Sequence, residues 1–208
     1  MKKTYLMALM PLMILAFFVN QSEADQILQP GSLWEYTFTD PTSNPAWNTT
    51  TGTGGWSSGL APFGNTTGPY DGDTTGAFSY KTYWAADNTG SWDDDLWVRT
   101  SVDFSGYSLS SLLWNLGVDN GFKLYVNGTL VASANGEGYT YMWEYSGNFS
   151  GISLNPGINI IAVALEDHGG LTAFDMEIRG TAVPEPGILI LLGISMVSVV
   201  GLKRWWKE

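Results

Sequence analysis

The chain contains no cysteine, only one histidine and few basic residues. Without cysteine, neither disulfide bonds nor thiolate metal sites can hold the fold, and one histidine cannot build a zinc site of several imidazoles. Between residues 25 and 183 there are 17 acidic and 4 basic residues, a net charge of −13. Because a nucleic-acid-binding protein must neutralise phosphates with Lys and Arg, we expect no nucleic-acid partner.

Between its two ends the chain also lacks a helical pattern of useful length. Instead, most of the chain's 25 glycines, together with many Thr, Ser and Asn residues, separate short stretches of β pattern. A length of 208 residues, with both ends used for targeting, leaves room for one domain, which we place at residues 25–182.

The N-terminus has the three parts of a secretory signal peptide. Lys2 and Lys3 give a positive start, an apolar run covers Tyr5 to Val19, and Ser22-Glu23-Ala24 offers small residues at the positions that signal peptidase reads. The sequence therefore predicts a signal peptide over residues 1–24. The alternative is an uncleaved membrane anchor.

The C-terminus, residues 183–208, combines a proline motif with an apolar run. Pro184, Glu185 and Pro186 form an extended junction, because prolines flanking a carboxylate cannot continue a helix. The uncharged run Gly187 to Leu202 is shorter than the roughly 20 residues of a typical spanning helix. The following tryptophans extend it to a predicted transmembrane helix over about residues 187–206, with a basic flank at Lys203 and Arg204 that should stay cytoplasmic.

This order of signal peptide, Pro-Glu-Pro, apolar helix and basic end resembles the PEP-CTERM sorting signal of Gram-negative bacteria. The resemblance implies recognition by an exosortase, a membrane transpeptidase that cuts near the motif, and export linked to exopolysaccharide. It implies a precursor anchored in the inner membrane that then reaches the outer surface or the extracellular matrix. The alternative is a plain membrane anchor with a proline-rich stalk.

The domain itself has β patterns throughout. Ser32 to Thr39 alternates, and its aromatic side Trp34, Tyr36 and Phe38 should face the core. The segment 40–73 is rich in Gly, Thr, Asn and Pro, so it is predicted to be a long loop with one or two short strands, a feature that is unusual unless functional.

The second half of the domain gives clearer strands. Asn127-Gly128 predicts a tight hairpin turn, and Ile158 to Leu165 is apolar enough to be buried on both faces. Further strands are predicted at 77–85, 97–104, 108–118, 122–126, 129–132, 139–145 and 173–178. Regular short strands with turns between them predict an all-β fold with a single β-sandwich or jelly roll.

Four motifs follow one another in this half. They are Trp97-x-Arg99, Asp119-Asn120-Gly121, Tyr125-Val126-Asn127-Gly128 and Leu154-x-Pro156-Gly157-x-Asn159-x-x-Ala162-Val163. Together they resemble the galactose-binding-like jelly roll, best known as the sugar-binding domain of family 2 glycoside hydrolases. The resemblance implies a non-catalytic module that binds glycans, sometimes with a structural calcium, although a fold alone does not establish a ligand.

The sequence offers little catalytic chemistry. His168 follows a buried strand, and Glu166 or Asp167 would be its partner in a catalytic interpretation. There is no Gly-x-Ser-x-Gly motif for a serine nucleophile. We assign no catalytic residue and expect a protein that is not an enzyme, with His168 hydrogen-bonding its loop or contributing to a binding rim.

Two acidic clusters are candidate calcium sites, since calcium takes six to eight oxygen ligands. The first is Asp71 and Asp73, and the second is Asp93, Asp94 and Asp95. Neither follows the twelve-residue EF-hand pattern. The alternative is that these carboxylates are solvated loop residues.

The tryptophans are the better indication of binding, because sugars stack their apolar C–H face on aromatic rings. Those in or near loops are candidate glycan contacts, together with Trp143 and His168: Trp47, Trp56, Trp84 and Trp92. Trp34, Trp97 and Trp114 lie in strands and are expected in the core.

Three functional hypotheses follow. The first is an exported, non-catalytic module that binds or organises exopolysaccharide. The second is a structural or adhesive matrix protein without a small ligand. The third is a glycoside hydrolase, which would need two carboxylates facing each other across a cleft.

Overall fold

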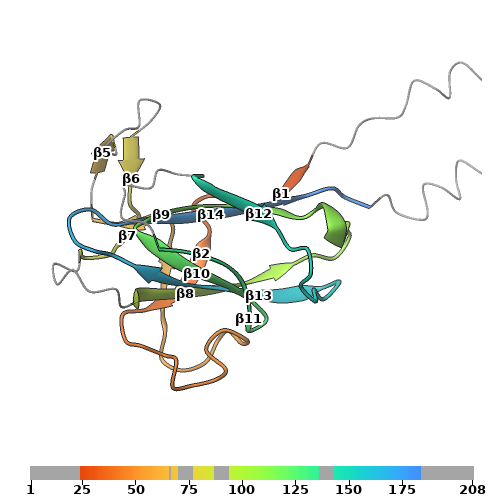
Figure 1. Cartoon of the computed structure of the whole chain (residues 1–208), viewed down its shortest axis with the longest axis horizontal. Coiled ribbons are helices and arrows are strands. Elements are labelled where there is room, and N and C mark those ends of the chain that lie inside the picture. Colours follow the sequence, from red (N-terminus) through yellow and green to blue (C-terminus); the bar gives the residue numbers. More distant parts are fainter. Residues whose placement is uncertain (1–23, 66, 70–76, 87–93, 136–142, 184–208) are drawn as a thin grey trace, which may run out of the picture.

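The computed structural model describes residues 24–65, 67–69, 77–86, 94–135 and 143–183, and these form a sandwich of two β-sheets. Figure 1 shows the two layers nearly edge-on, with a small separate hairpin beside them. The all-β sandwich predicted from the strand and turn pattern is confirmed. The predicted signal peptide and the sorting tail with its Pro-Glu-Pro motif, apolar run and basic flank lie outside the described residues.

The first sheet has the strand order β12-β9-β14-β4-β7, and β1 also pairs with β14. The pairs are antiparallel except β4 with β7. Its strands are β1 (Asp25–Leu28), β4 (Phe63–Gly64), β7 (Thr82–Tyr83), β9 (Leu113–Asp119), β12 (Tyr145–Asn148) and β14 (Ala173–Gly180). A 3₁₀ turn, η1 (Leu109–Ser111), precedes β9.

The second sheet has the order β11-β10-β13-β8-β2-β3, and all its pairs are antiparallel. Its strands are β2 (Leu33–Thr37), β3 (Ser57–Leu60), β8 (Asp94–Asp103), β10 (Gly121–Val126), β11 (Thr129–Ala134) and β13 (Ile158–Glu166). The hairpin outside both sheets is β5 (Thr67–Pro69) with β6 (Ala77–Ser79).

The core lies between the sheets and is rich in aromatic side chains. Trp34 meets Phe174 edge-on with ring centroids 5.3 Å apart, and Phe63 lies 6.1 Å from the same ring. Trp34, Phe63 and Phe174 are all buried. Successive side chains of a strand point to opposite faces of its sheet, so every second residue enters this core. This is why most strands have apolar residues at alternate positions in the sequence.

Several sequence predictions are confirmed in the second sheet. β13 is buried at every position after Ile158, as its continuous apolar run predicts. Asn127 and Gly128 both have positive φ, 49° and 81°, and join β10 to β11 as a tight hairpin. Asp119-Asn120-Gly121 carries the chain from β9 in one sheet to β10 in the other.

Other predictions were wrong. Phe38, expected in the core with Trp34 and Tyr36, is 51% exposed, because β2 ends at Thr37 and the chain leaves the sheet there. Trp143, expected within a strand, precedes β12 in a left-handed conformation with φ of 70°. β1 was not predicted, since its few residues show no apolar alternation.

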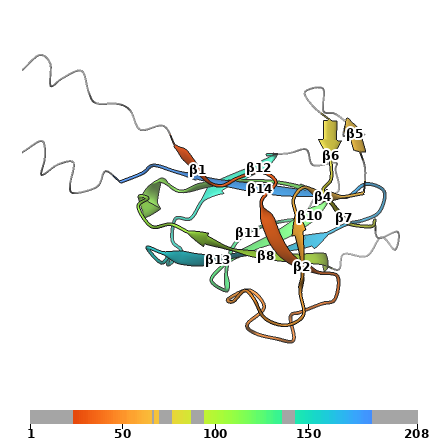
Figure 2. The ribbon, with the colours of Figure 1, turned by 180° about the vertical axis from the view of Figure 1, so that it is seen from behind.

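The sandwich has two different ends. The first and last described strands meet at one of them, where Asp25 of β1 pairs with Gly180 of β14. We call this the terminal end; Figures 1 and 2 both show the chain entering and leaving there. The opposite end, which carries Asp119-Asn120-Gly121 and Glu166-Asp167-His168, is called the distal end.

None of the described residues forms a helix long and apolar enough to cross a membrane.

Candidate functional site

The long loop between β2 and β3 folds over the outer face of the second sheet. Trp47, in this loop, packs on Trp97 and meets Tyr125 edge-on with centroids 5.3 Å apart. Ala162 and Ala164 on the central strand β13 are small enough to leave room for the two indoles. Trp47 is therefore only 6% exposed, and its prediction as a glycan contact is wrong, because the loop buries it against the sheet.

Arg99 of β8 holds this loop in place. Its Nε donates to Glu35 Oε2 at 2.7 Å, Nη1 donates to the Trp47 carbonyl at 3.1 Å, and Nη2 donates to the Thr53 carbonyl. The guanidinium carbon lies 4.0 Å from the centroid of the Trp56 ring. The side chain is 1% exposed, so a buried cation is matched by a carboxylate, two carbonyls and an aromatic face.

Beside this cation lies a polar depression of about 200 Å³, which we call the Arg99 pocket. Its lining residues come from β2, β3, β8 and the loop: Leu33, Trp34, Glu35, Thr51, Ser58, Arg99, Thr100 and Ser101. Glu35 is 24% exposed and already accepts from Arg99 and from the Gly52 N–H at 2.6 Å. Since a carboxylate has about four lone-pair sites, Glu35 keeps acceptor capacity toward the pocket.

Trp56 does not itself line the Arg99 pocket, but among the described loop tryptophans it is the one whose ring contacts Arg99, which does line it. Trp56 is partly exposed and covers the same guanidinium that lines the Arg99 pocket. Trp84 is 1% exposed in the core, where its carbonyl accepts from Thr172 Oγ1 at 2.6 Å. The prediction of Trp84 as a glycan contact is therefore wrong. Trp92 lies outside the described residues.

The distal end carries most of the other predicted site residues. His168, whose side chain is 11% exposed, donates its backbone N–H to Asn120 Oδ1 at 2.7 Å and places Nε2 3.7 Å from Glu166 Oε2. Lys123 Nζ lies 3.6 Å from the other oxygen of Glu166. Glu166, which is 5% exposed, therefore lies between the side chains of Lys123 and His168. Trp143, partly buried, precedes β12 at this same end.

The candidate calcium ligands are only partly described. Asp71, Asp73 and Asp93 lie outside the described residues, and Asp94 begins β8 opposite Glu166. Asp95 Oδ2 accepts the Asp167 N–H at 2.7 Å, so this carboxylate fixes the turn after β13. Within the part of the chain that the structure describes, no group of three or more His, Asp or Glu side chains could hold a metal ion.

The outer face of the first sheet buries two carboxylates of β14. Glu177 accepts from Gln26, Asn115 and Arg179 at 2.7–3.1 Å. Burial alone would raise its pKa, but the hydrogen bonds from Arg179, Asn115 and Gln26 bring the pKa of Glu177 below its usual value.

Asp175, two residues earlier, has a different environment. Its carboxylate accepts the N–H groups of Gly31 and Met176 at 2.8–3.2 Å, beneath the turn that joins β1 to β2. Burial raises the pKa of Asp175 from its usual 3.8 to about 6; the two N–H groups oppose this, and the nearby charge of Glu177 adds to it.

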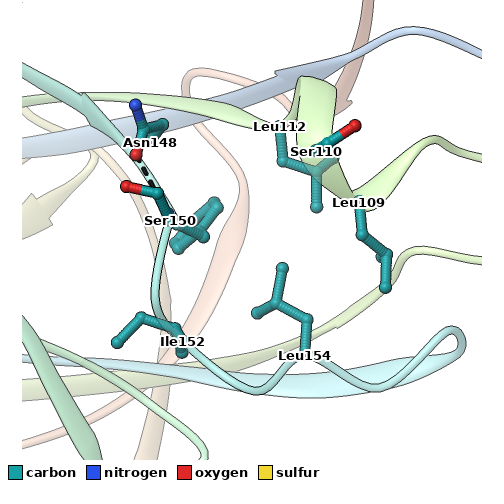
Figure 3. Close-up of a pocket in the computed structure, with 8 residues that line it drawn as sticks. Leu109, Ser110, Leu112, Asn148, Ser150, Ile152 and Leu154 are labelled. Carbon is teal, nitrogen blue, oxygen red and sulfur yellow. Dashed lines mark hydrogen bonds between the residues drawn. The ribbon is translucent and has the colours of Figure 1, made fainter.

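A larger groove of about 430 Å³ opens at the terminal end, and we call it the end groove. Its lining contains no charged residue: Leu109, Ser110, Leu112, Asn148, Phe149, Ser150, Ile152 and Leu154. Figure 3 shows η1 forming one wall and the segment after β12 forming the opposite wall and the floor. Asn148 Oδ1 is occupied by the Ser150 N–H at 2.9 Å, and the lining combines five apolar residues with three neutral polar ones.

The Arg99 pocket and the end groove were not predicted from the sequence. Arg99 gave a usable signal, because it directly follows the apolar residues 96–98 within a strand, where a buried cation needs a partner, and only four basic residues occur between residues 25 and 183. Glu35 gave none, since alternation places it on the polar side of an ordinary strand.

The chain matches no protein-family model and no curated protein. Among solved structures it is similar to β-glucuronidases. It shares 9% identity and a TM-score of 0.46 with the Ruminococcus gnavus enzyme in complex with D-glucuronic acid, covering 76% of this chain and 29% of that one. The β-glucuronidase of an uncultured Clostridium species gives 11% identity and a TM-score of 0.45, covering 78% and 30%. The chain thus spans less than a third of the length of these enzymes.

Proposed function

We propose that this protein is exported, sorted by an exosortase and displayed at the cell envelope, where its β-sandwich contacts exopolysaccharide without cleaving it. The glycan contact is placed at Trp56 and the Arg99 pocket. Signal peptidase and an exosortase are the processing partners in this proposal. The inner membrane holds the precursor before processing.

The proposed route rests on the order of segments in the sequence. A charged start, an apolar run and a small-residue cleavage site precede the domain, and Pro184-Glu185-Pro186, an apolar run and Lys203-Arg204 follow it. The sandwich between them brings its first and last strands to the same end. A tether at this end would leave the distal end, and the loop that covers the second sheet, free to contact a matrix.

The proposed glycan contact rests on one observation: Trp56 lies on the cation that lines a polar depression. A sugar ring offers apolar C–H groups that stack on an indole and hydroxyls that need donors and acceptors. Next to Trp56, the pocket supplies the carboxylate of Glu35 and the hydroxyls of Thr51, Ser58 and Thr100.

A structural matrix role without a ligand is the second candidate. The observation that favours it is the burial of Trp47 and Trp84, which places two of the predicted contacts in packing rather than at a surface.

Glycan binding is tested with the domain of residues 25–183, shown to unfold cooperatively, on a polysaccharide array with calcium and with chelator. We expect saturable binding to one class of polysaccharide, weakened at least about tenfold by Trp56→Ala, the loss of about one stacked ring. Tyr83→Ala is the control, because Tyr83 is a 58% exposed aromatic on the first sheet. If both variants weaken binding equally, the glycan does not bind at Trp56. No binding by the folded domain would favour the matrix role.

Sorting is tested separately in a host that carries an exosortase. Replacing Pro184, Glu185 and Pro186 together by alanine should leave the chain at its precursor mass in the inner membrane. Mass spectrometry of the membrane and extracellular fractions measures this. Normal processing of the variant would contradict an exosortase route and favour a plain anchor.

A further inference from the structure

We propose that the end groove is a docking site for the first apolar residues of the chain's own C-terminal run, Gly187 to Leu191, when that run is not in a membrane. The proposal does not depend on the glycan contact or on the exosortase. It rests on the lining of the groove and on the place where the described chain ends.

The lining of the groove suits an apolar segment rather than a sugar. Leu109, Leu112, Phe149, Ile152 and Leu154 supply its walls, and no charged side chain lines it. Its volume of about 430 Å³ falls in the range of small-ligand sites, and its polar lining consists of the neutral side chains of Ser110, Asn148 and Ser150. Apolar surface of this kind gains about 25 cal/mol per Å² when an apolar partner covers it.

The C-terminal end of the described chain is fixed beside one wall of this groove. After β14 the backbone runs against the segment before η1: Ser108 N–H donates to the Thr181 carbonyl at 3.0 Å, and Val183 N–H donates to the Gly106 carbonyl at 2.7 Å. Ser111 of η1 accepts the Thr181 N–H at 2.8 Å. The last described residue, Val183, is therefore held next to the turn that builds the groove.

The packing at Gly180 connects the end groove with the C-terminal end of the described chain. A Cβ built on Gly180 would lie 2.6 Å from Leu112 Cδ2, so the end of β14 packs directly against a side chain that lines the groove. Three residues, Pro184 to Pro186, separate Val183 from the apolar run. In extended form, the four steps from Val183 to Gly187 span at most about 14 Å, so the start of the apolar run stays near the end of the sandwich that carries the groove.

Docking and membrane spanning exclude each other. The apolar run has sixteen residues, already fewer than the roughly 20 that a spanning helix uses. Holding its first five residues in the groove leaves too few to cross. The groove would thus cover part of the run in water and release it to a bilayer.

The absence of cysteine allows a direct test by disulfide cross-linking of the full chain, synthesised in a cell-free system without membranes. The test pair is Ile152→Cys with Leu189→Cys, and Leu154→Cys replaces the first change if that variant misfolds. The control pair joins Leu189→Cys to Leu130→Cys, a 51% exposed position on β11 of the second sheet. We expect the test pair to form an intramolecular bond about tenfold faster than the control pair, because docking raises the effective concentration.

Liposomes added during synthesis should abolish this advantage, since they compete for the run. Equal rates for the two pairs without membranes would overturn the proposal. A bond found only between two chains would assign the groove to a second copy. A faster bond from Ile152→Cys to Ile14→Cys than to Leu189→Cys would assign it to the N-terminal apolar run, which also contradicts the proposal.

Discussion

On the outer face of the second sheet, a cation is buried against a counter-charge, whereas on the outer face of the first sheet, Asp175 is buried near a like charge. Arg99 meets Glu35, two carbonyls and an indole. Asp175 meets two backbone N–H groups and the field of Glu177. Both side chains are almost fully buried, so burial alone does not decide their effect on stability.

Arg99 and Asp175 differ in the parts of the structure that their charged groups connect. Arg99 joins a strand to a loop 46–52 residues away in sequence, and the loop in turn covers Trp47 and Trp97. Asp175 fixes one turn, and its neighbours do not compensate the cost of its charge. We therefore expect one face to depend on its buried ion and the other to be more stable without the charge of Asp175.

The largest effect is expected from Arg99→Met, which removes the ion pair between Arg99 and Glu35. The change leaves Glu35 and two carbonyls without their donor in a half-buried site, so we expect the free energy of unfolding to fall by about 3–5 kcal/mol. Urea denaturation at pH 7 measures it. Arg99→Lys should recover less than half of the loss, because an ammonium cannot reproduce three directed contacts. A loss below about 1 kcal/mol would mean that the loop does not depend on the ion.

For Asp175→Asn we expect the opposite effect, an increase in the free energy of unfolding, because Asp175 has no cationic partner among the described residues. Between about pH 4 and pH 6 the folded protein binds the Asp175 proton and the unfolded chain does not, so the free energy of unfolding decreases as the pH rises through this range. A pKa shift from 3.8 to about 6 corresponds to about 3 kcal/mol. Asp175→Asn should therefore be up to that much more stable than the wild type at pH 8, and this difference should fall toward zero as the pH drops below the usual pKa of 3.8.

Thermal and urea unfolding across pH 4–8 measure this difference. If Asp175→Asn is less stable than the wild type at pH 8, the charged form is favoured in the folded protein and the comparison between the two faces fails.

Glu177→Gln sharpens the comparison within one strand. Because the pKa of Glu177 is lowered, its charged form stabilises the fold above its usual pKa of 4.5, and this contribution is lost as the pH falls through the lowered value. We expect the variant to lose about 1.5 kcal/mol at pH 7, the scale of a hydrogen bond to a charged group. NMR titration should also show a lower pKa for Asp175, since a like charge is gone. An unchanged Asp175 pKa would leave burial as the sole cause.

The smallest effect is expected from Trp56→Ala. A cation–π contact at a partly exposed site contributes about 0.5–1 kcal/mol, so the variant should stay folded with a slightly lower free energy of unfolding. Urea denaturation gives the value, with Trp47→Ala as the buried counterpart, for which about 3–5 kcal/mol is expected. Similar losses in the two variants would show that Trp56 is a packing residue as well, which would weaken its proposed role as a glycan contact.

Local patterns in the sequence were sufficient for most strands of the second sheet. The apolar run of β13 and the Asn127-Gly128 turn depend on neighbours in sequence, and both predictions are confirmed. The segment 40–73 was predicted to be a long loop with one or two short strands, unusual unless functional, and the structure has three strands within it, β3, β4 and β5. Its role in the fold follows from contacts with Arg99 and Ala162 that are distant in sequence, and no local pattern encodes them.

The aromatic residues show the same limit for site prediction. A tryptophan in a loop has no periodicity that separates packing from exposure, so Trp47, Trp56 and Trp84 gave identical signals. The structure separates them: Trp47 and Trp84 are buried, whereas Trp56 is partly exposed and stacks on Arg99. The end groove is formed by side chains from η1 and from the segment after β12, and it could be found only once the sheets had been assembled.

The pairing of β1 with β14 at the terminal end has a mechanical consequence. A force applied between Asp25 and Val183 would peel these two antiparallel strands apart one hydrogen bond at a time. A force between the tail and the turn after β9 at the distal end runs along β14 and loads its whole register with β9, from Ala173 to Arg179, in shear. A chain held at its tail and pulled from its far end would therefore resist extension with seven residue pairs acting together.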